Sequence, residues 1–157
     1  MTANAKNRMQ GLALAALLAF LGGCVTKGYV LEHTAIDIAN PEETAAWWVE
    51  NLGFEITAQL DNEMHTTFIV DRTGRIAIEM YRSLDGVPPP DYQSMRTDEL
   101  HFGFVSEDVD ADIARLTAAG AKLVKRDTSP VVDNAILKDP SGLSIQFIKR
   151  ANPVLKH

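Results

Sequence analysis

The sequence predicts an α+β fold of two βαβββ modules, and three observations lead to this prediction. His33 is matched 68 positions later by His101, and Glu79 is matched 67 positions later by Gln146. The turn motif at 71–74, Asp-Arg-Thr-Gly, recurs at 139–142 as Asp-Pro-Ser-Gly. Each half also reads as an alternating strand, a helical stretch and three further alternating strands. Repetition at a fixed offset indicates a duplicated structural unit.

The first half supplies its elements in order. Residues 32–38 alternate and are rich in β-forming residues, which predicts a strand. Asn40, Pro41 and Glu43 then form a helix start, with Asn as the cap and Glu three residues after it. The helix is expected to run to about residue 52 and to end at Gly53. Strands are predicted at 54–60, 64–70 and 75–82, the last two joined by the 71–74 turn.

The second half repeats this order. A strand is predicted at 100–105, a helix at 109–119 ending at Gly120, and strands at 121–126, 134–138 and 143–149. Residues 83–98, with three prolines at 88–90, are too long for a tight connection and are expected to cross the surface between the modules. Within this linker, Tyr92, Met95 and Arg96 could cover the mouth of a pocket, a plain linker being the alternative.

The N-terminus has the pattern of an export signal. Lys6 and Arg8 precede an apolar run at 11–21, which is too short to span a membrane as a helix. Leu21-Gly22-Gly23-Cys24 resembles the lipobox of bacterial lipoproteins. The resemblance implies a signal peptide at 1–23, cleavage before Cys24, acylation of Cys24 (palmitate among the acyl chains), a tether at 24–30 and a folded part at 31–150. The protein is then expected in the bacterial cell envelope, anchored to the membrane; the alternative is an ordinary secretory signal.

Charge and cysteine content exclude several classes of function. The formal net charge is −6, and removal of the two positive charges in residues 1–23 leaves −8. No Lys/Arg cluster stands out, so nucleic-acid binding is not expected. The single cysteine, Cys24, excludes an internal disulfide and a cysteine-based metal cluster.

Residue parity along the strands divides the side chains between two faces. One face is apolar and is expected to pack under the helices. The other carries one metal-capable side chain per strand: His33, Glu79, His101 and Gln146. Each of these has a small residue nearby, so this face is expected to line a cavity, and the repeat would bring the four side chains to one centre. Histidine, carboxylate and amide groups are ligands of divalent metals.

At these residues the chain resembles the vicinal oxygen chelate superfamily, which includes glyoxalase I, bleomycin-resistance proteins and extradiol dioxygenases. The resemblance rests on Leu-Glu-His-Thr-Ala-Ile at 31–36, on Leu-His-Phe-Gly-Phe at 100–104 and on Asp-Pro-Ser-Gly-Leu-Ser-Ile-Gln-Phe-Ile at 139–148. It implies paired modules in a half-open barrel and a divalent metal (Zn, Ni, Fe, Mn or Co) held by His33, Glu79, His101 and Gln146. Gln146 departs from the glutamate usual in glyoxalases, and an amide cannot act as a general base. Glu79 is then the candidate catalytic base.

Two hypotheses follow from these observations. The first is a metal-dependent lyase or isomerase acting on a small substrate that chelates through two oxygens. The second is a protein that binds and sequesters a small molecule or drug without catalysis. In either case the modules could pair within one chain or exchange between the two chains of a homodimer.

Overall fold

The computed structural model describes residues 28–154. The predicted signal peptide at 1–23 and the predicted acylation site Cys24 lie outside the described residues. Leu31–His157 forms one compact unit, separate from the residues before it. The buried hydrophobic residues run from Ile36 to Phe147, so this unit contains a hydrophobic core of its own, as an independently folding domain requires. Within 28–154, no helix has the length and apolar character needed to cross a bilayer.

Each half of the compact unit contains one helix and four strands in the predicted order. The first half consists of β1 (His33–Asp37), α1 (Pro41–Leu52), β2 (Glu55–Gln59), β3 (Thr67–Val70) and β4 (Ala77–Tyr81). The second consists of β5 (Phe102–Val105), α2 (Val109–Ala118), β6 (Lys122–Thr128), β7 (Val132–Lys138) and β8 (Ser144–Arg150). The predicted pair of βαβββ modules is therefore confirmed.

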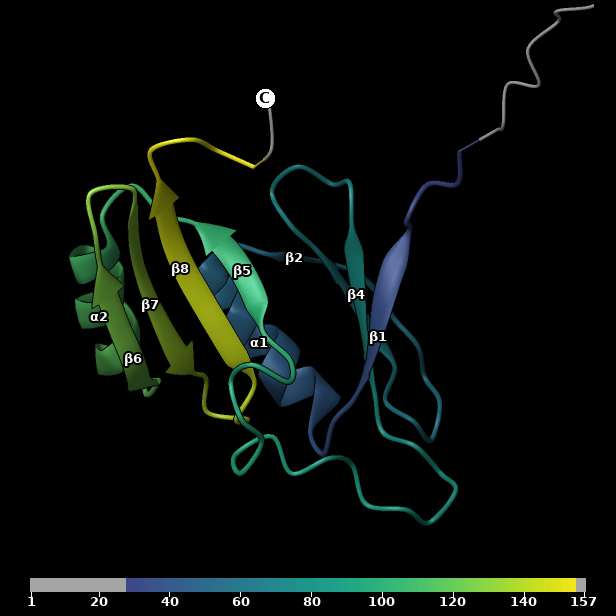
Figure 1. Ribbon diagram of the computed structural model, residues 1–157. Coiled ribbons are helices and arrows are strands. Elements are labelled where there is room, and N and C mark those ends of the chain that lie inside the picture. Colours follow the sequence, from purple (N-terminus) through teal and green to yellow (C-terminus); the bar gives the residue numbers. More distant parts are fainter. Residues whose placement is uncertain (1–27, 155–157) are drawn as a thin grey trace, which may run out of the picture. The chain divides into compact units, whose positions relative to one another are not determined.

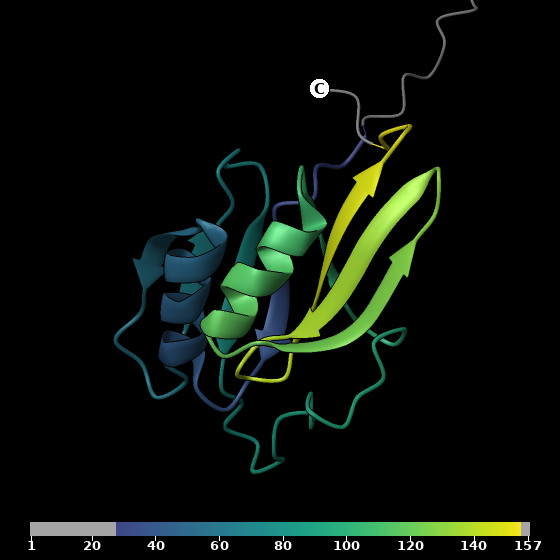
Figure 2. The same cartoon turned by 90° about the vertical axis from the view of Figure 1, so that its left-hand side faces the viewer.

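The strands form two separate four-stranded sheets, in the orders β1-β4-β3-β2 and β5-β8-β7-β6. β1 pairs with β4 and β5 pairs with β8 in parallel, and the other neighbouring strands pair antiparallel. Figure 1 shows the first sheet to the right of the second. Figure 2 shows α1 and α2 side by side, with the strands of the second sheet to the right of α2. The helices cover one face of the paired sheets and leave the other face open, which is the predicted half-open barrel.

Trp48 stands at the centre of the core. Its side chain is completely buried, and its ring packs edge-on against Phe54 at 5.2 Å and Phe102 at 5.3 Å between centroids. Phe104 lies 5.9 Å away on the same strand as Phe102. A residue of α1 therefore packs on β5 of the other module, and this aromatic cluster joins the two modules.

The two helices are also tied by polar contacts. The indole N–H of Trp47 donates to the carbonyl of Ala119 at 2.9 Å. The Arg115 guanidinium donates to the carbonyl of Asn51 at 2.6 Å. Trp48 thus packs in the core, whereas the adjacent Trp47 is only partly buried and packs against the core from its edge.

The linker is anchored to the second module and does not cross the surface freely. The Tyr92 side chain is buried, and its hydroxyl donates to the Asp37 carbonyl at 3.0 Å. The buried ammonium of Lys138 donates to three linker carbonyls, those of Tyr92, Gln93 (2.7 Å) and Met95 (2.8 Å). Tyr92 and Met95 therefore fix the linker in place, and Tyr92 belongs to the core.

The two helices begin differently. Asn40 occupies the cap position of α1, as predicted, but its side chain makes no capping hydrogen bond. Its backbone carbonyl accepts the amide of Thr44 at 3.0 Å, which is the first bond of the helix. The predicted cap position is therefore confirmed, whereas a side-chain cap by Asn40 is absent. In α2 the Asp108 carboxylate caps the helix by accepting the Ala111 amide at 3.0 Å. Gly53 ends α1 with φ +73°, a left-handed conformation that glycine adopts without steric cost.

Candidate functional site

The open face of each sheet is built around small residues. Across the parallel strand pairs, His33 lies opposite Ala77 and Glu79 lies opposite Ala35. In the second sheet, Gln146 lies opposite Gly103. A Cβ atom at Gly103 would stand 3.6 Å from the Gln146 Oε1, so any larger side chain there would crowd the amide. The strand register thus leaves room beside each of these polar groups.

In the first sheet, the structure brings together two of the predicted ligands. His33 Nε2 lies 3.5 Å from Glu79 Oε2, and His33 Nδ1 lies 2.9 Å from Glu32 Oε2. The Nδ1–H can therefore donate to Glu32, which leaves Nε2 facing the Glu79 carboxylate. Phe68 packs edge-on against the imidazole at 6.1 Å and limits its rotation. The pair is partly exposed to solvent.

In the second sheet, the predicted ligands make different contacts. His101 immediately precedes β5, and its Nδ1 bonds to the Thr97 carbonyl at 3.0 Å, so that Nε2 remains available. The Gln146 amide nitrogen donates to Asn134 Oδ1 at 3.0 Å. The Gln146 carbonyl oxygen is therefore the group that this side chain offers to a ligand.

The four predicted ligands do not converge within one chain. Among residues 28–154, no three His, Cys, Asp or Glu side chains lie close enough together to hold a metal ion. His33 and Glu79 belong to one sheet, whereas Gln146 belongs to the other and His101 precedes its first strand. The residues as they are placed therefore do not fit a bound metal, although each imidazole has one nitrogen of the right type available.

An apolar pocket of about 390 Å³ lies on the open face of the second sheet. Its floor is formed by Gly103 and Val105 of β5 and by Gln146 and Ile148 of β8. Pro153 and Val154, in the segment after β8, form a wall. Sequence reasoning placed Val105 and Ile148 on this face by parity but assigned them no role.

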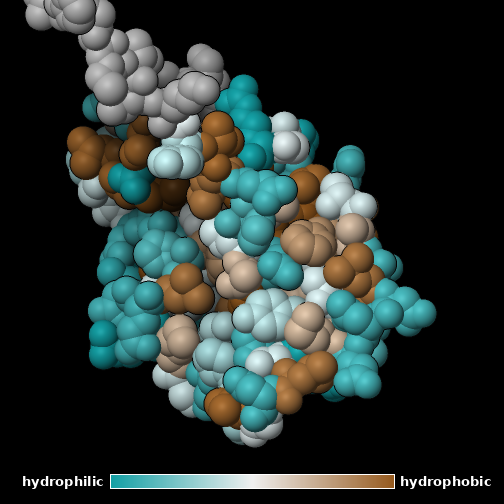
Figure 3. Space-filling view, turned by 90° about the vertical axis from the view of Figure 1, so that its right-hand side faces the viewer, coloured by the Kyte–Doolittle hydropathy of each residue, from teal (hydrophilic) through white to brown (hydrophobic). Residues whose placement is uncertain are grey.

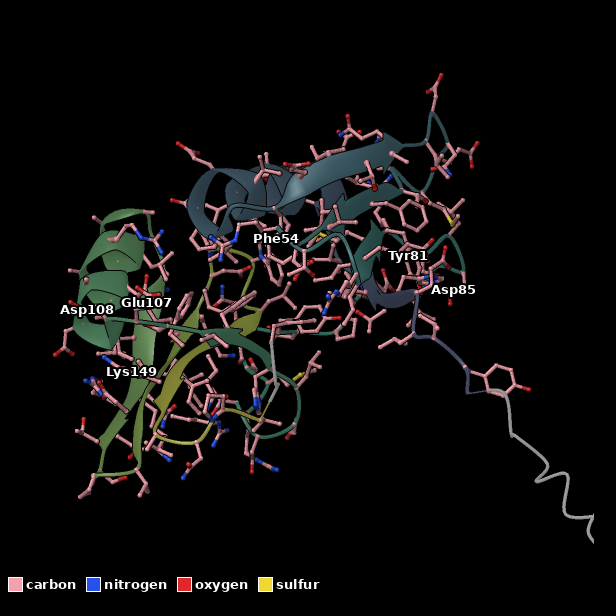
Figure 4. All side chains as sticks on the ribbon, turned by 90° about the horizontal axis from the view of Figure 1, so that it is seen from above. Phe54, Tyr81, Asp85, Glu107, Asp108 and Lys149 are labelled. Atoms are coloured by element: carbon pink, nitrogen blue, oxygen red, sulfur yellow. The ribbon has the colours of Figure 1, made fainter. Side chains whose placement is uncertain are left out.

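The described residues that line the pocket belong to the second module and to the segment that follows it. None of them comes from the first sheet. In Figure 4, Tyr81 at the end of β4 lies well apart from Lys149 of β8, which lines the pocket. Figure 3 shows that the side of the molecule seen there presents hydrophobic residues in separate groups among hydrophilic ones.

A second hollow, of about 480 Å³, lies between the start of α1, the linker and the β7–β8 turn. Asp139 lines it and is buried, and its carboxylate accepts the indole N–H of Trp48 at 2.7 Å. The Ser141 hydroxyl and the Leu143 amide also donate to it. Burial raises the pKa of the Asp139 carboxyl above its usual value, although these bonds oppose the shift. This network joins the modules and supports the fold.

Comparison with solved structures shows the same fold in other proteins. The antibiotic-binding protein TnmS3 from Streptomyces sp. CB03234 is 20% identical, with a TM-score of 0.62 over 80% of this chain and 98% of that one. A glyoxalase/bleomycin resistance protein/dioxygenase superfamily member from Sphaerobacter thermophilus DSM 20745 is 22% identical, with a TM-score of 0.58 over 77% and 96% of the two chains. A glyoxalase I mutant from Zea mays is 21% identical, with a TM-score of 0.60 over 78% of this chain and 46% of that one.

Comparison with curated proteins gives no match. A family model described as a glyoxalase-like domain matches residues 33–148. This range includes both helices and all eight strands, except for the last two residues of β8. The match covers most of the compact unit and agrees with the two-module topology. The chain therefore belongs to the glyoxalase-like domain family.

Proposed function

We propose that this protein binds a small, largely apolar molecule on the open face of its second sheet. The observation that carries the proposal is the pocket floored by Gly103, Val105, Gln146 and Ile148. Its volume of about 390 Å³ lies within the range of small-molecule sites, about 300–1,000 Å³. Val105 is 76% exposed, so its side chain is accessible to a ligand in this pocket. The similar fold of TnmS3, an antibiotic-binding protein, supports such a role.

Titration with the neutral fluorescent dye phenylnaphthylamine tests this function. The dye is expected to bind residues 28–157, and Val105→Asp is expected to weaken binding at least about tenfold by placing a charge in the apolar floor. Val131→Asp is the matched control, because Val131 is also exposed but lies outside the pocket. Equal binding by the protein and by Val105→Asp would contradict the proposal.

A metal-dependent lyase or isomerase is the second candidate, favoured by the 3.5 Å approach of His33 Nε2 to Glu79 Oε2. Glu79 would then be the base, and His101 and Gln146 would have to approach the pair, from the same chain or from the second chain of a homodimer. Elemental analysis tests this candidate. One divalent ion per chain, lost in both His33→Ala and His101→Ala, supports it. A protein that binds no divalent ion at stoichiometric level contradicts it.

We also propose that the chain is exported and anchored to the bacterial membrane through acylated Cys24. The support is the sequence at 21–24 and the compact unit that begins shortly after it, at Leu31. Labelling with a palmitate analogue should mark the full chain but not Cys24→Ser. Equal labelling of both would contradict acylation at this residue.

A further inference from the structure

The pocket changes character along β8. Gln146, Ile148 and Arg150 alternate on one face of the strand and all three line the pocket. They present in turn an amide, an apolar chain and a cation. At about 3.3 Å per residue, the row extends about 13 Å from the amide to the guanidinium. The pocket is therefore polar at one end, apolar in the middle and positive at the other end.

Cations line the positive end of the pocket. Among the residues that the structure describes, Lys149 and Arg150 are the charged ones that line it, and no Asp or Glu does so. The Lys149 ammonium is already engaged, since it donates to the Glu107 carbonyl at 2.8 Å. Figure 4 shows Lys149 on the same side of the molecule as Glu107.

Arg150 differs from the other arginines of the second module. Arg115 pairs with Asp112 at 2.9 Å, and Arg126 pairs with Asp110 at 2.9 Å. The Arg150 side chain is exposed, and within 28–154 no ion pair joins its guanidinium to a carboxylate. An arginine on the ligand-facing side of a strand, beside an apolar floor, is suited to a planar acidic group.

We infer that the ligand of this pocket is an amphiphilic anion: an apolar body roughly 10 Å long that carries one acidic group. The acidic group pairs with Arg150, the body covers Val105 and Ile148, and a donor at the far end meets the Gln146 carbonyl oxygen. The inference rests on the proposed function, because it assigns the chemical class of that pocket's ligand. The bond of the Gln146 amide nitrogen to Asn134 is what leaves the oxygen free for this donor.

A pair of dyes tests the inference on residues 28–157. Anilinonaphthalene sulfonate and phenylnaphthylamine share an apolar body, but only the first is an anion. The anion should bind about tenfold more tightly than the neutral dye, as one charge-assisted contact predicts. Arg150→Gln should remove that advantage and leave the neutral dye within twofold, whereas Arg150→Lys should retain most of it. Arg72→Gln, an exposed arginine outside the pocket, should change neither dye.

The possible results distinguish a failure of the inferred ligand class from a failure of the proposed binding function. If both dyes bind but Arg150→Gln weakens them equally or not at all, the inferred ligand class is wrong and the pocket remains. If neither dye binds, or if Val105→Asp leaves both affinities unchanged, the proposed function fails and the ligand class fails with it.

Discussion

Replacing Lys138 by Met tests how the linker is held against the second module. The ammonium donates to the carbonyls of Tyr92, Gln93 and Met95, and the side chain is 8% exposed. Three charge-assisted bonds at about 1.5 kcal/mol each contribute about 4.5 kcal/mol. The apolar burial of Met and the avoided desolvation of the ammonium offset roughly 2 kcal/mol. The expected loss in the free energy of unfolding is therefore about 2–3 kcal/mol.

Urea unfolding followed by tryptophan fluorescence measures this loss, because Trp48 lies in the core that the linker covers. With a slope of about 1.5 kcal/mol per molar urea, the midpoint should fall by about 1.5–2 M. Lys125→Met is the control: this lysine is exposed and pairs with Asp127 at 2.8 Å, and its loss should cost under about 1 kcal/mol. If Lys138→Met shifts the midpoint no more than Lys125→Met, the three carbonyl bonds do not stabilise the linker and the reasoning is refuted.

Three further predictions follow from the same structure. Asp139→Asn should lower the free energy of unfolding by about 1–3 kcal/mol, because the amide replaces a carboxylate that accepts the Trp48 indole N–H. Burial raises the pKa of Asp139 in the folded protein above 3.8, so the stability that this group contributes is present below pH 3.8 and is lost as the pH rises through the folded pKa. Urea unfolding should therefore show a larger loss of stability in Asp139→Asn at about pH 3.5 than at pH 7. Gly142→Ala should lower the thermal midpoint by roughly 10 °C, because φ is +94° and the new Cβ would stand 2.6 Å from the Gln93 nitrogen, whereas Gly74→Ala, also at positive φ but in open space, should cost much less. Treatment with EDTA should leave the affinity for phenylnaphthylamine within twofold, and a larger loss would favour the metal-dependent candidate.

The sequence predicted the elements because each depends on local information. Alternation identified the strands, and Gly53 and the 139–142 turn marked where elements end. The repeat offset matched His33 to His101 and Glu79 to Gln146 at equivalent points of the two modules. Parity put His33 and Glu79 on the open face, where the structure brings them to 3.5 Å. These features follow from the alternation of side chains along strands and from the repeat in the sequence.

The remaining features depend on contacts between distant segments. In the sequence, Lys138 has the pattern of an ordinary strand residue. Its anchoring of the linker depends on contacts with carbonyls more than 40 positions earlier, which no local pattern indicates. The separation of the two halves of the predicted metal site depends on how the modules pack, which is set by Trp48 and its aromatic neighbours. The pocket wall at Pro153 and Val154 depends on the path of the chain after β8, for which the sequence carries no periodic signal.

A heteronuclear NMR titration of residues 28–157 with anilinonaphthalene sulfonate tests the central claim most directly, because it locates the bound molecule residue by residue. The chemical shift changes should concentrate in Phe102–Val105 and in the second half of β8, with the Arg150 side chain among them. Shifts centred on His33 and Glu79, or an even scatter over the surface, would contradict it.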